Sequence, residues 1–152
     1  MIKAKAVVAL APRMVRVQSL EVPEPGPEEV VVRLRHSWIS NGTEGSFVRG
    51  ERLAGDTPLR ESDPSPFPLV PGYQKVGVVE RLGAGVADLE RGQAVFATVS
   101  QTPGMFFSHG GHVSPAVTHR SQIWKVPQGV DPLALSGLVL TQVGYNCGMR
   151  LL

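Results

Sequence analysis

Two histidines separated by two glycines have the residue types and the spacing of a metal site. His109 and His112 flank Gly110 and Gly111, and imidazole is a common ligand of Zn²⁺. The glycines indicate a loop that leads into a strand, and no carboxylate or thiol lies nearby in the sequence to complete three ligands. The sequence therefore favours a structural role for both histidines over zinc binding.

Other patterns that carry chemistry in proteins are incomplete or missing. The stretch "LGAGVAD" holds Gly83 and Gly85, but Asp88 stands where a dinucleotide fingerprint has its third glycine. We interpret this stretch as a hairpin turn between two strands. The sequence has no Gly-x-Ser-x-Gly elbow, no P-loop and no paired carboxylates. The chain by itself is therefore not expected to bind a dinucleotide well.

Composition and charge limit the class of protein. With 152 residues and 42% hydrophobic residues, the chain is long enough for one core. Its 17 glycines and 13 prolines indicate short strands joined by tight turns. The net charge of +2 and the scattered lysines and arginines predict no nucleic-acid or membrane partner. Cys147 is the only cysteine, which excludes intrachain disulfides and favours a reducing cytoplasm.

Short segments with alternating apolar residues predict a mainly β fold. The count of about seven short strands favours a partly open β-barrel or sandwich. In one expected strand, 30–37, His36 falls on the apolar face and is expected to be a core histidine. The strands are expected at residues 3–9, 14–22, 30–37, within 70–96, and in two short runs between 112 and 127.

A helical turn and a long loop are expected after the third strand. Asn41 and Thr43 are good helix N-cap residues, and Glu44 suits the first turn near the positive end of the helix dipole. Residues 50–66 are polar, rich in glycine and proline and without either periodicity. They are therefore expected to form a surface loop.

The last segment predicts a helix that needs a neighbour. Asp131 followed by Pro132 is a strong helix start, and no charged residue follows until Arg150. The segment is too polar and too rich in glycine for a membrane span. A helix without charge is usually buried on most sides, so we expect something else to pack against residues 132–152.

The order of several motifs resembles the N-terminal catalytic domain of the medium-chain dehydrogenase/reductase superfamily, in its alcohol dehydrogenase group. The motifs are "VPEPGPEEVVVRLRHSWIS", "NGTE", "FPLVPGYQKVGVVERLGAGVADLERGQAVF" and "GGHVSPAVTHRSQIWKVPQGVDPLALSGL". The resemblance implies a GroES-like, partly open β-barrel over residues 1–130. It also implies that residues 131–152 begin the helix that leads into a Rossmann domain, which this chain lacks.

The departures from the family pattern concern the metal. In zinc-dependent members, a zinc-binding histidine stands at the position of Tyr73 and a glutamate at the position of Gln74. The first cysteine ligand falls on Asn41 or, with a shift of one residue, on Ser40, and the third ligand falls near Gly137. The four-cysteine structural zinc lobe is missing. Because neutral Tyr, Asn, Ser and Gly do not form a zinc ligand set, we expect no catalytic metal.

The resemblance also implies roles for two hydroxyls. Thr43 matches the proton-relay Thr or Ser of the family, and Tyr73 takes a former metal position, so either hydroxyl could polarise a substrate oxygen. The alternatives are that Thr43 only caps a helix and that Tyr73 only fills the space left by zinc. Thr141 matches a threonine that contacts nicotinamide in relatives. The residues expected around the substrate are Ser40, Asn41, Glu44 and Gln74.

The resemblance is to the zinc-free branch with bacteriochlorophyllide a dehydrogenase and threonine-dehydrogenase-like proteins. It implies an NAD(P)-dependent oxidoreductase that acts on an alcohol/carbonyl pair and is inactive as this isolated domain. Zinc-free quinone or enoyl reductases are an alternative. A stand-alone GroES-like binding module without catalysis is an alternative of another class. The expected partners are a small-molecule substrate and the missing C-terminal Rossmann domain, and a homodimer stays open.

Overall fold

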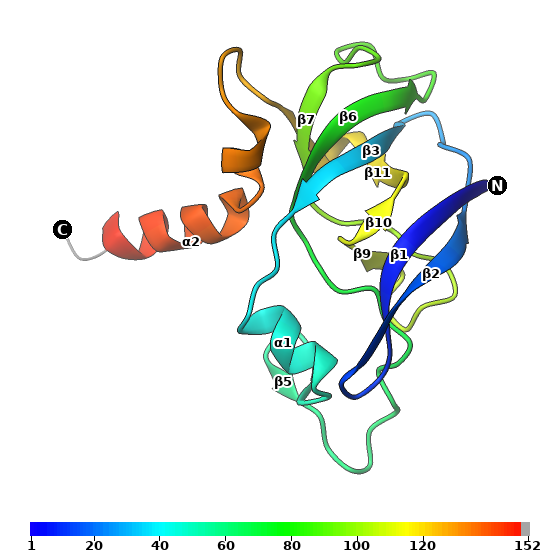
Figure 1. The fold of residues 1–152 in the computed structure, drawn as a ribbon, viewed down its shortest axis with the longest axis vertical. Coiled ribbons are helices and arrows are strands. Elements are labelled where there is room, and N and C mark those ends of the chain that lie inside the picture. The colour runs from blue at the N-terminus through cyan, green and yellow to red at the C-terminus, as the bar shows by residue number, and fades with distance from the viewer. Residues whose placement is uncertain (150–152) are drawn as a thin grey trace.

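Two antiparallel sheets form the body of the protein in a computed structural model, which describes residues 1–149 (Figure 1). The first sheet has the order β10-β1-β2 and comprises β1 (Ile2–Ala11), β2 (Met14–Val22) and β10 (Val113–Ser114). The second has the order β11-β3-β6-β7-β12 and comprises β3 (Glu29–Ser37), β6 (Lys75–Leu82), β7 (Ala94–Ala97), β11 (Ala116–His119) and β12 (Ile123–Lys125).

Smaller elements complete the fold. Two short hairpins pair β4 (Arg52–Ala54) with β5 (Thr57–Pro58), and β8 (Ser100–Gln101) with β9 (His109–Gly110). The helical elements are α1 (Thr43–Val48), α2 (Leu138–Met149) and the 3₁₀ turns η1 (Arg120–Gln122) and η2 (Pro132–Leu135). Among the described residues, no helix has both the length and the apolar character needed to span a membrane.

The chain joins the two sheets at Pro115. Strand β10 pairs with β1 in the first sheet, and β11, which follows directly after Pro115, pairs with β3 in the second. The Ser114 hydroxyl accepts a hydrogen bond of 3.2 Å from the backbone N–H of Leu34 in β3, which ties β10 to the second sheet. The expectation of a mainly β, partly open architecture is confirmed.

The five-stranded sheet separates two hydrophobic clusters. On β3, Val31 packs with the cluster that also contains residues of β1, while its neighbours Val30 and Val32 pack with the other cluster. All three valines are at most 1% exposed. The sheet is therefore buried on both faces here.

Two expectations for this region are wrong. His36 is exposed and not in the core, because a shift of register between Leu34 and His36 interrupts the alternation of β3. Residues 50–66 do not form a plain loop, because they contain the small hairpin β4–β5. Strands of two and three residues are too short to show a periodicity.

The helices differ from the prediction at their ends. Helix α1 occurs where expected, but its N-cap is Gly42 without a side-chain hydrogen bond, so the capping role predicted for Asn41 and Thr43 is wrong. The Asp131 carboxylate does cap η2, since it accepts from the backbone N–H of Leu133 at 3.0 Å. Helix α2 has no buried residue and projects away from the sheets (Figure 1). The expected helix positions 150–152 lie outside the described residues.

Candidate functional site

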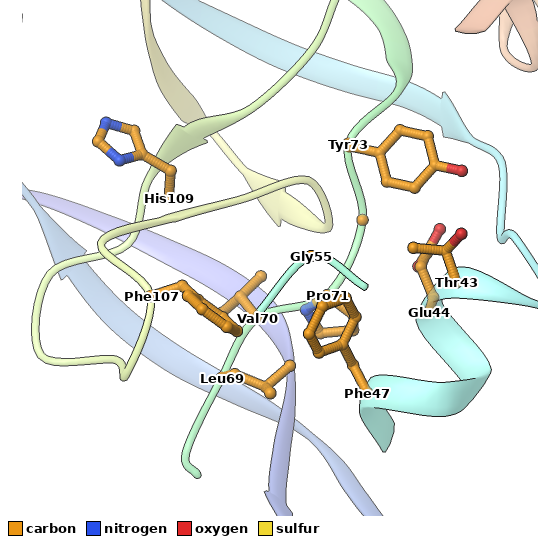
Figure 2. Close-up of a pocket in the computed structure, with 11 residues that line it drawn as sticks. Thr43, Glu44, Phe47, Gly55, Leu69, Val70, Pro71, Tyr73, Phe107 and His109 are labelled. Atoms are coloured by element: carbon orange, nitrogen blue, oxygen red, sulfur yellow. The ribbon is translucent and has the colours of Figure 1, made fainter. Parts of the chain in front are cut away.

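A cavity of about 180 Å³ lies between α1, the segment 69–73 and the loop before β9 (Figure 2). Helix α1 contributes Thr43, Glu44 and Phe47, and the turn between β4 and β5 contributes Gly55. The opposite walls are residues 69–73, Phe107 and His109. Three segments that are far apart in the sequence therefore meet around one space.

The cavity has an aromatic wall. The rings of Phe47 and Phe107 meet edge to face with centroids 5.7 Å apart, and Phe106 packs in the same manner on Phe107 at 5.0 Å. Such edge-to-face pairs stabilise one arrangement of the rings. The wall favours a ligand with an apolar portion.

Thr43 and Tyr73, the two hydroxyl residues expected to act on a substrate, line this same cavity. Figure 2 shows the Tyr73 ring with its hydroxyl on the side where the start of α1 carries Thr43. Both side chains are partly exposed, so both are accessible to a ligand. The cavity thus brings together an apolar wall and two neutral hydrogen-bond donors.

Glu44, which lines the cavity, forms a hydrogen-bonded pair with His112. Glu44 is 3% exposed and His112 is 7% exposed, with 2.7 Å between His112 Nε2 and Glu44 Oε2. The other carboxylate oxygen accepts from the backbone N–H of Ser40 at 2.9 Å. Glu44 lines the cavity with both of its carboxylate oxygens hydrogen-bonded within the protein, and its contact with a substrate stays a prediction. Sequence reasoning also missed this role of His112.

The corner before Tyr73 needs glycine because the His112 ring covers it. Gly72 has φ +98°, and a Cβ atom there would lie 2.8 Å from His112 Nε2. The backbone N–H groups of Gly111 and His112 both donate to the carbonyl oxygen of Pro71 at 3.1 Å. The segment that carries His112 therefore fixes the backbone on which Tyr73 stands.

Lys75 is a buried cation two residues after Tyr73. Its side chain is fully buried, and its ammonium group donates to the carbonyl oxygen of Gly111 at 3.3 Å. Burial lowers the pKa of Lys75 to about 7, because the charged form loses its hydration. Nothing in the sequence pattern indicated this lysine, since its position in β6 reads as an ordinary strand residue.

The positions at which the family resemblance places zinc ligands, and the neighbouring Gln74, carry no thiolate or imidazole. Gln74 is fully buried, and its Oε1 accepts from the backbone N–H of Val139 at 3.1 Å, at the start of α2. Gly137 has no side chain, and a Cβ atom there would lie 3.4 Å from the indole ring of Trp38. With Tyr73 at the position of the zinc-binding histidine and Asn41 or Ser40 at that of the first cysteine, the residues present do not fit a zinc ion. No group of three or more His, Cys, Asp or Glu side chains within residues 1–149 is placed to share a metal.

The remaining predicted residues lie away from the cavity. Ser40 is 6% exposed and contacts Glu44 through its backbone, whereas Asn41 is exposed. Thr141 is exposed on the first turn of α2, and its hydroxyl donates to the carbonyl oxygen of Gly137 at 3.2 Å. The cavity therefore unites Thr43, Glu44 and Tyr73, but not Ser40, Asn41, Gln74 or Thr141.

The sequence of this domain matches a known family. The chain belongs to the alcohol dehydrogenase GroES-like domain family, whose model matches residues 26–128. This result confirms the resemblance to the N-terminal domain of the medium-chain dehydrogenase/reductase superfamily.

Relatives of known name are oxidoreductases. The 2-desacetyl-2-hydroxyethyl bacteriochlorophyllide A dehydrogenase of Cereibacter sphaeroides is 36% identical over 80 residues, which cover 51% of this chain and 22% of that protein. An alcohol dehydrogenase of Moraxella sp. is 31% identical over an alignment of 156 positions, which covers 90% of this chain and 43% of that protein.

A solved structure shows the same fold. A dehydrogenase of Sinorhizobium meliloti, named as zinc-binding and bound to NADP, superposes with a TM-score of 0.65 at 20% identity. The match covers 90% of this chain and 42% of that one. This chain thus spans less than half the length of each of these proteins.

Proposed function

We propose that the chain is the substrate-binding and catalytic domain of a zinc-independent, NAD(P)-dependent oxidoreductase that interconverts an alcohol and its carbonyl compound. The observation that carries the proposal is the meeting of Thr43 and Tyr73 in one cavity with an apolar wall. A bound nicotinamide dinucleotide supplies or accepts the hydride in such enzymes. The dinucleotide-binding domain is proposed to follow α2, with Thr141 facing the cofactor from the exposed side of this helix.

The hydroxyls of Thr43 and Tyr73 supply what zinc supplies in other members. In carbonyl reduction, negative charge develops on the substrate oxygen, and a hydrogen-bond donor that is already in place stabilises this charge. In alcohol oxidation, the same hydroxyls orient the substrate by hydrogen bonds, and each can pass the substrate's hydroxyl proton on to water by giving up its own proton as it accepts that one. The apolar wall around Phe47 and Phe107 holds the carbon portion of the substrate.

Reduction of an activated double bond is the second candidate. The aromatic wall of Phe47 and Phe107 favours it, since conjugated substrates stack well on aromatic rings. In that reaction the same hydroxyls would hold the carbonyl oxygen of an enone. A cytoplasmic location is part of our proposal, because the single Cys147 suits a reducing compartment.

Loss of either hydroxyl is expected to lower turnover in the full-length protein. A screen of secondary alcohols, ketones and enones with NAD(H) and NADP(H), followed through the absorbance of the reduced nicotinamide, tests the activity. With a substrate in hand, Thr43→Val or Tyr73→Phe should lower kcat about 10- to 1,000-fold. Ser19→Ala is the control for loss of a hydroxyl, because Ser19 is exposed on β2, which contributes no residue to the cavity. Unchanged kinetics in both cavity variants would return the two residues to a structural role.

Metal analysis of the purified full-length protein is expected to find no stoichiometric zinc. The physical reason is the donor set, since Tyr73, Gly137 and Asn41 or Ser40 cannot replace thiolates and an imidazole. Dialysis against a chelator should leave turnover unchanged. One zinc per chain, or activity that returns only with added zinc, contradicts the zinc-independent mechanism.

A further inference from the structure

The pair Glu44–His112 is shielded from water and has a partner at each polar atom that the pair presents. Besides the bond between the two residues, the His112 ring bonds through Nδ1 to the Ser37 hydroxyl at 3.0 Å, and Glu44 accepts from the backbone of Ser40. An ionised carboxylate only accepts hydrogen bonds, so Nε2–H of His112 is the donor to ionised Glu44. The Ser37 hydroxyl can donate to Nδ1 or accept from it, so it is a partner of the ring in either protonation state. A buried network with all its bonds made stabilises a single geometry.

Each member of the pair is adjacent to one of the two proposed catalytic hydroxyls. Glu44 directly follows Thr43 at the start of α1. The His112 ring lies against Gly72, where a Cβ atom would approach three ring atoms to within 2.9 Å, and Gly72 directly precedes Tyr73. The hydrogen bond therefore joins the helix that carries one hydroxyl to the segment of His112, which packs against the corner that carries the other.

We propose that Glu44 and His112 are positioning residues that hold the Thr43 and Tyr73 hydroxyls in register across the cavity. The functional part rests on the proposed function, which assigns the chemistry to these hydroxyls. Helix α1 has only six residues, and so short a helix is marginal by itself. Without the pair, α1 loses the one side-chain hydrogen bond among the described residues that ties it to the segment packed against the corner.

The variants His112→Leu and His112→Gln test whether the hydrogen bond to Glu44, and not only the bulk of the side chain, holds Tyr73 and Thr43 in place. Leucine removes both ring nitrogens, whereas glutamine keeps a side-chain N–H that can donate to Glu44. We expect His112→Leu to shift and broaden the ring signals of isotope-labelled Tyr73 and the amide signal of Thr43 in NMR spectra. His112→Gln should restore the signals. The second tyrosine, Tyr145 on α2, is an internal reference and should not change.

Two results would overturn the proposal. One is a folded His112→Leu protein in which the Tyr73 and Thr43 signals stay as in the wild type. The other needs no variant: labelled histidine in the wild-type protein should show a slowly exchanging proton on His112 Nε2, and a freely exchanging or absent proton there rejects the pair. This second measurement tests the Glu44–His112 hydrogen bond even if His112→Leu does not fold.

Kinetics of the full-length enzyme complete the test. His112→Leu should lower kcat about 10- to 100-fold while KM changes little, as for residues that only orient others. His112→Gln should recover most of the rate. Normal turnover in His112→Leu rejects the positioning role and leaves the proposed function intact. Absence of turnover in the wild type with every substrate rejects the proposed function, while the NMR result still decides on the position of the two side chains.

Discussion

Replacing Lys75 with Met is expected to stabilise the protein, most strongly at and below neutral pH. The Lys75 side chain is fully buried, and its only partner among the described residues is the carbonyl oxygen of Gly111. Its pKa falls from 10.5 to about 7 because the charged form is desolvated. Each pKa unit corresponds to about 1.4 kcal/mol. After a deduction for the lost hydrogen bond, the gain should be about 2–4 kcal/mol.

The sign of the pH dependence follows from proton binding. Below about pH 7, Lys75 is protonated in both the folded and the unfolded states, so the folded state carries the full cost of the buried charge. Between about pH 7 and 10.5, only the unfolded state holds the proton, so the stability of the wild type rises with pH. The difference between wild type and Lys75→Met should therefore shrink across this range and vanish above it.

Urea unfolding at several pH values measures this difference. Lys3→Met is the matched control, because Lys3 is exposed on β1 and its substitution should change stability by less than about 0.5 kcal/mol at any pH. A constant offset between wild type and Lys75→Met from pH 6 to pH 10 would contradict a desolvated amine as the cause.

The strands could be predicted because their pattern is local. Alternation and the turn residues between them indicated β1, β2 and β3 within two residues of their ends. The prediction that His36 lies in the core failed, because the shift in register between β3 and β6 depends on both strands and cannot be read from one. The predicted capping of α1 by Asn41 or Thr43 also failed. The Glu44 carboxylate instead accepts a hydrogen bond from the backbone N–H of Ser40, just before the helix.

The candidate site could be predicted only in part. Thr43 and Tyr73 were found through their match to a family pattern, and the cavity brings them together. The pair of Glu44 and His112 joins residues 68 positions apart, so no local spacing reveals it. The sequence did present His112 beside two glycines, and the physical reason for these glycines is the close approach of backbone segments, not a metal.

For the last segment, the sequence predicted where the helical structure begins but not how it is divided. Its start at Asp131 is a local signal and is confirmed, but the single helix expected from Pro132 is divided into η2 and α2. Gly137 lies at the division, where it packs against the Trp38 ring. Val143 on α2 is 54% exposed, so the neighbour expected for this helix stays a prediction.

Gly111→Ala is expected to destabilise the protein by about 2–3 kcal/mol, because overpacking here cannot be relieved by a side-chain movement. A Cβ atom at position 111 would lie 2.3 Å from the carbonyl carbon of Gly72 and 2.6 Å from the backbone N of Tyr73. Either the segment of Gly111, between β9 and β10, or the corner at Gly72 must therefore move, and this corner carries Tyr73. The measurement is the free energy of unfolding in urea, with the Tyr73 ring signals as a local readout.

Gly144→Ala is the matched control, since a Cβ atom at this position of α2 meets nothing within 4 Å. Alanine is the better helix former, so this variant should be as stable as the wild type or up to about 1 kcal/mol more stable. If Gly111→Ala unfolds at the same urea concentration as Gly144→Ala, the backbone around Tyr73 is not tightly packed. A corner that tolerates the extra methyl group could not hold a hydroxyl in place for catalysis. The stability of this one variant therefore tests the physical basis of the candidate site without any knowledge of the substrate.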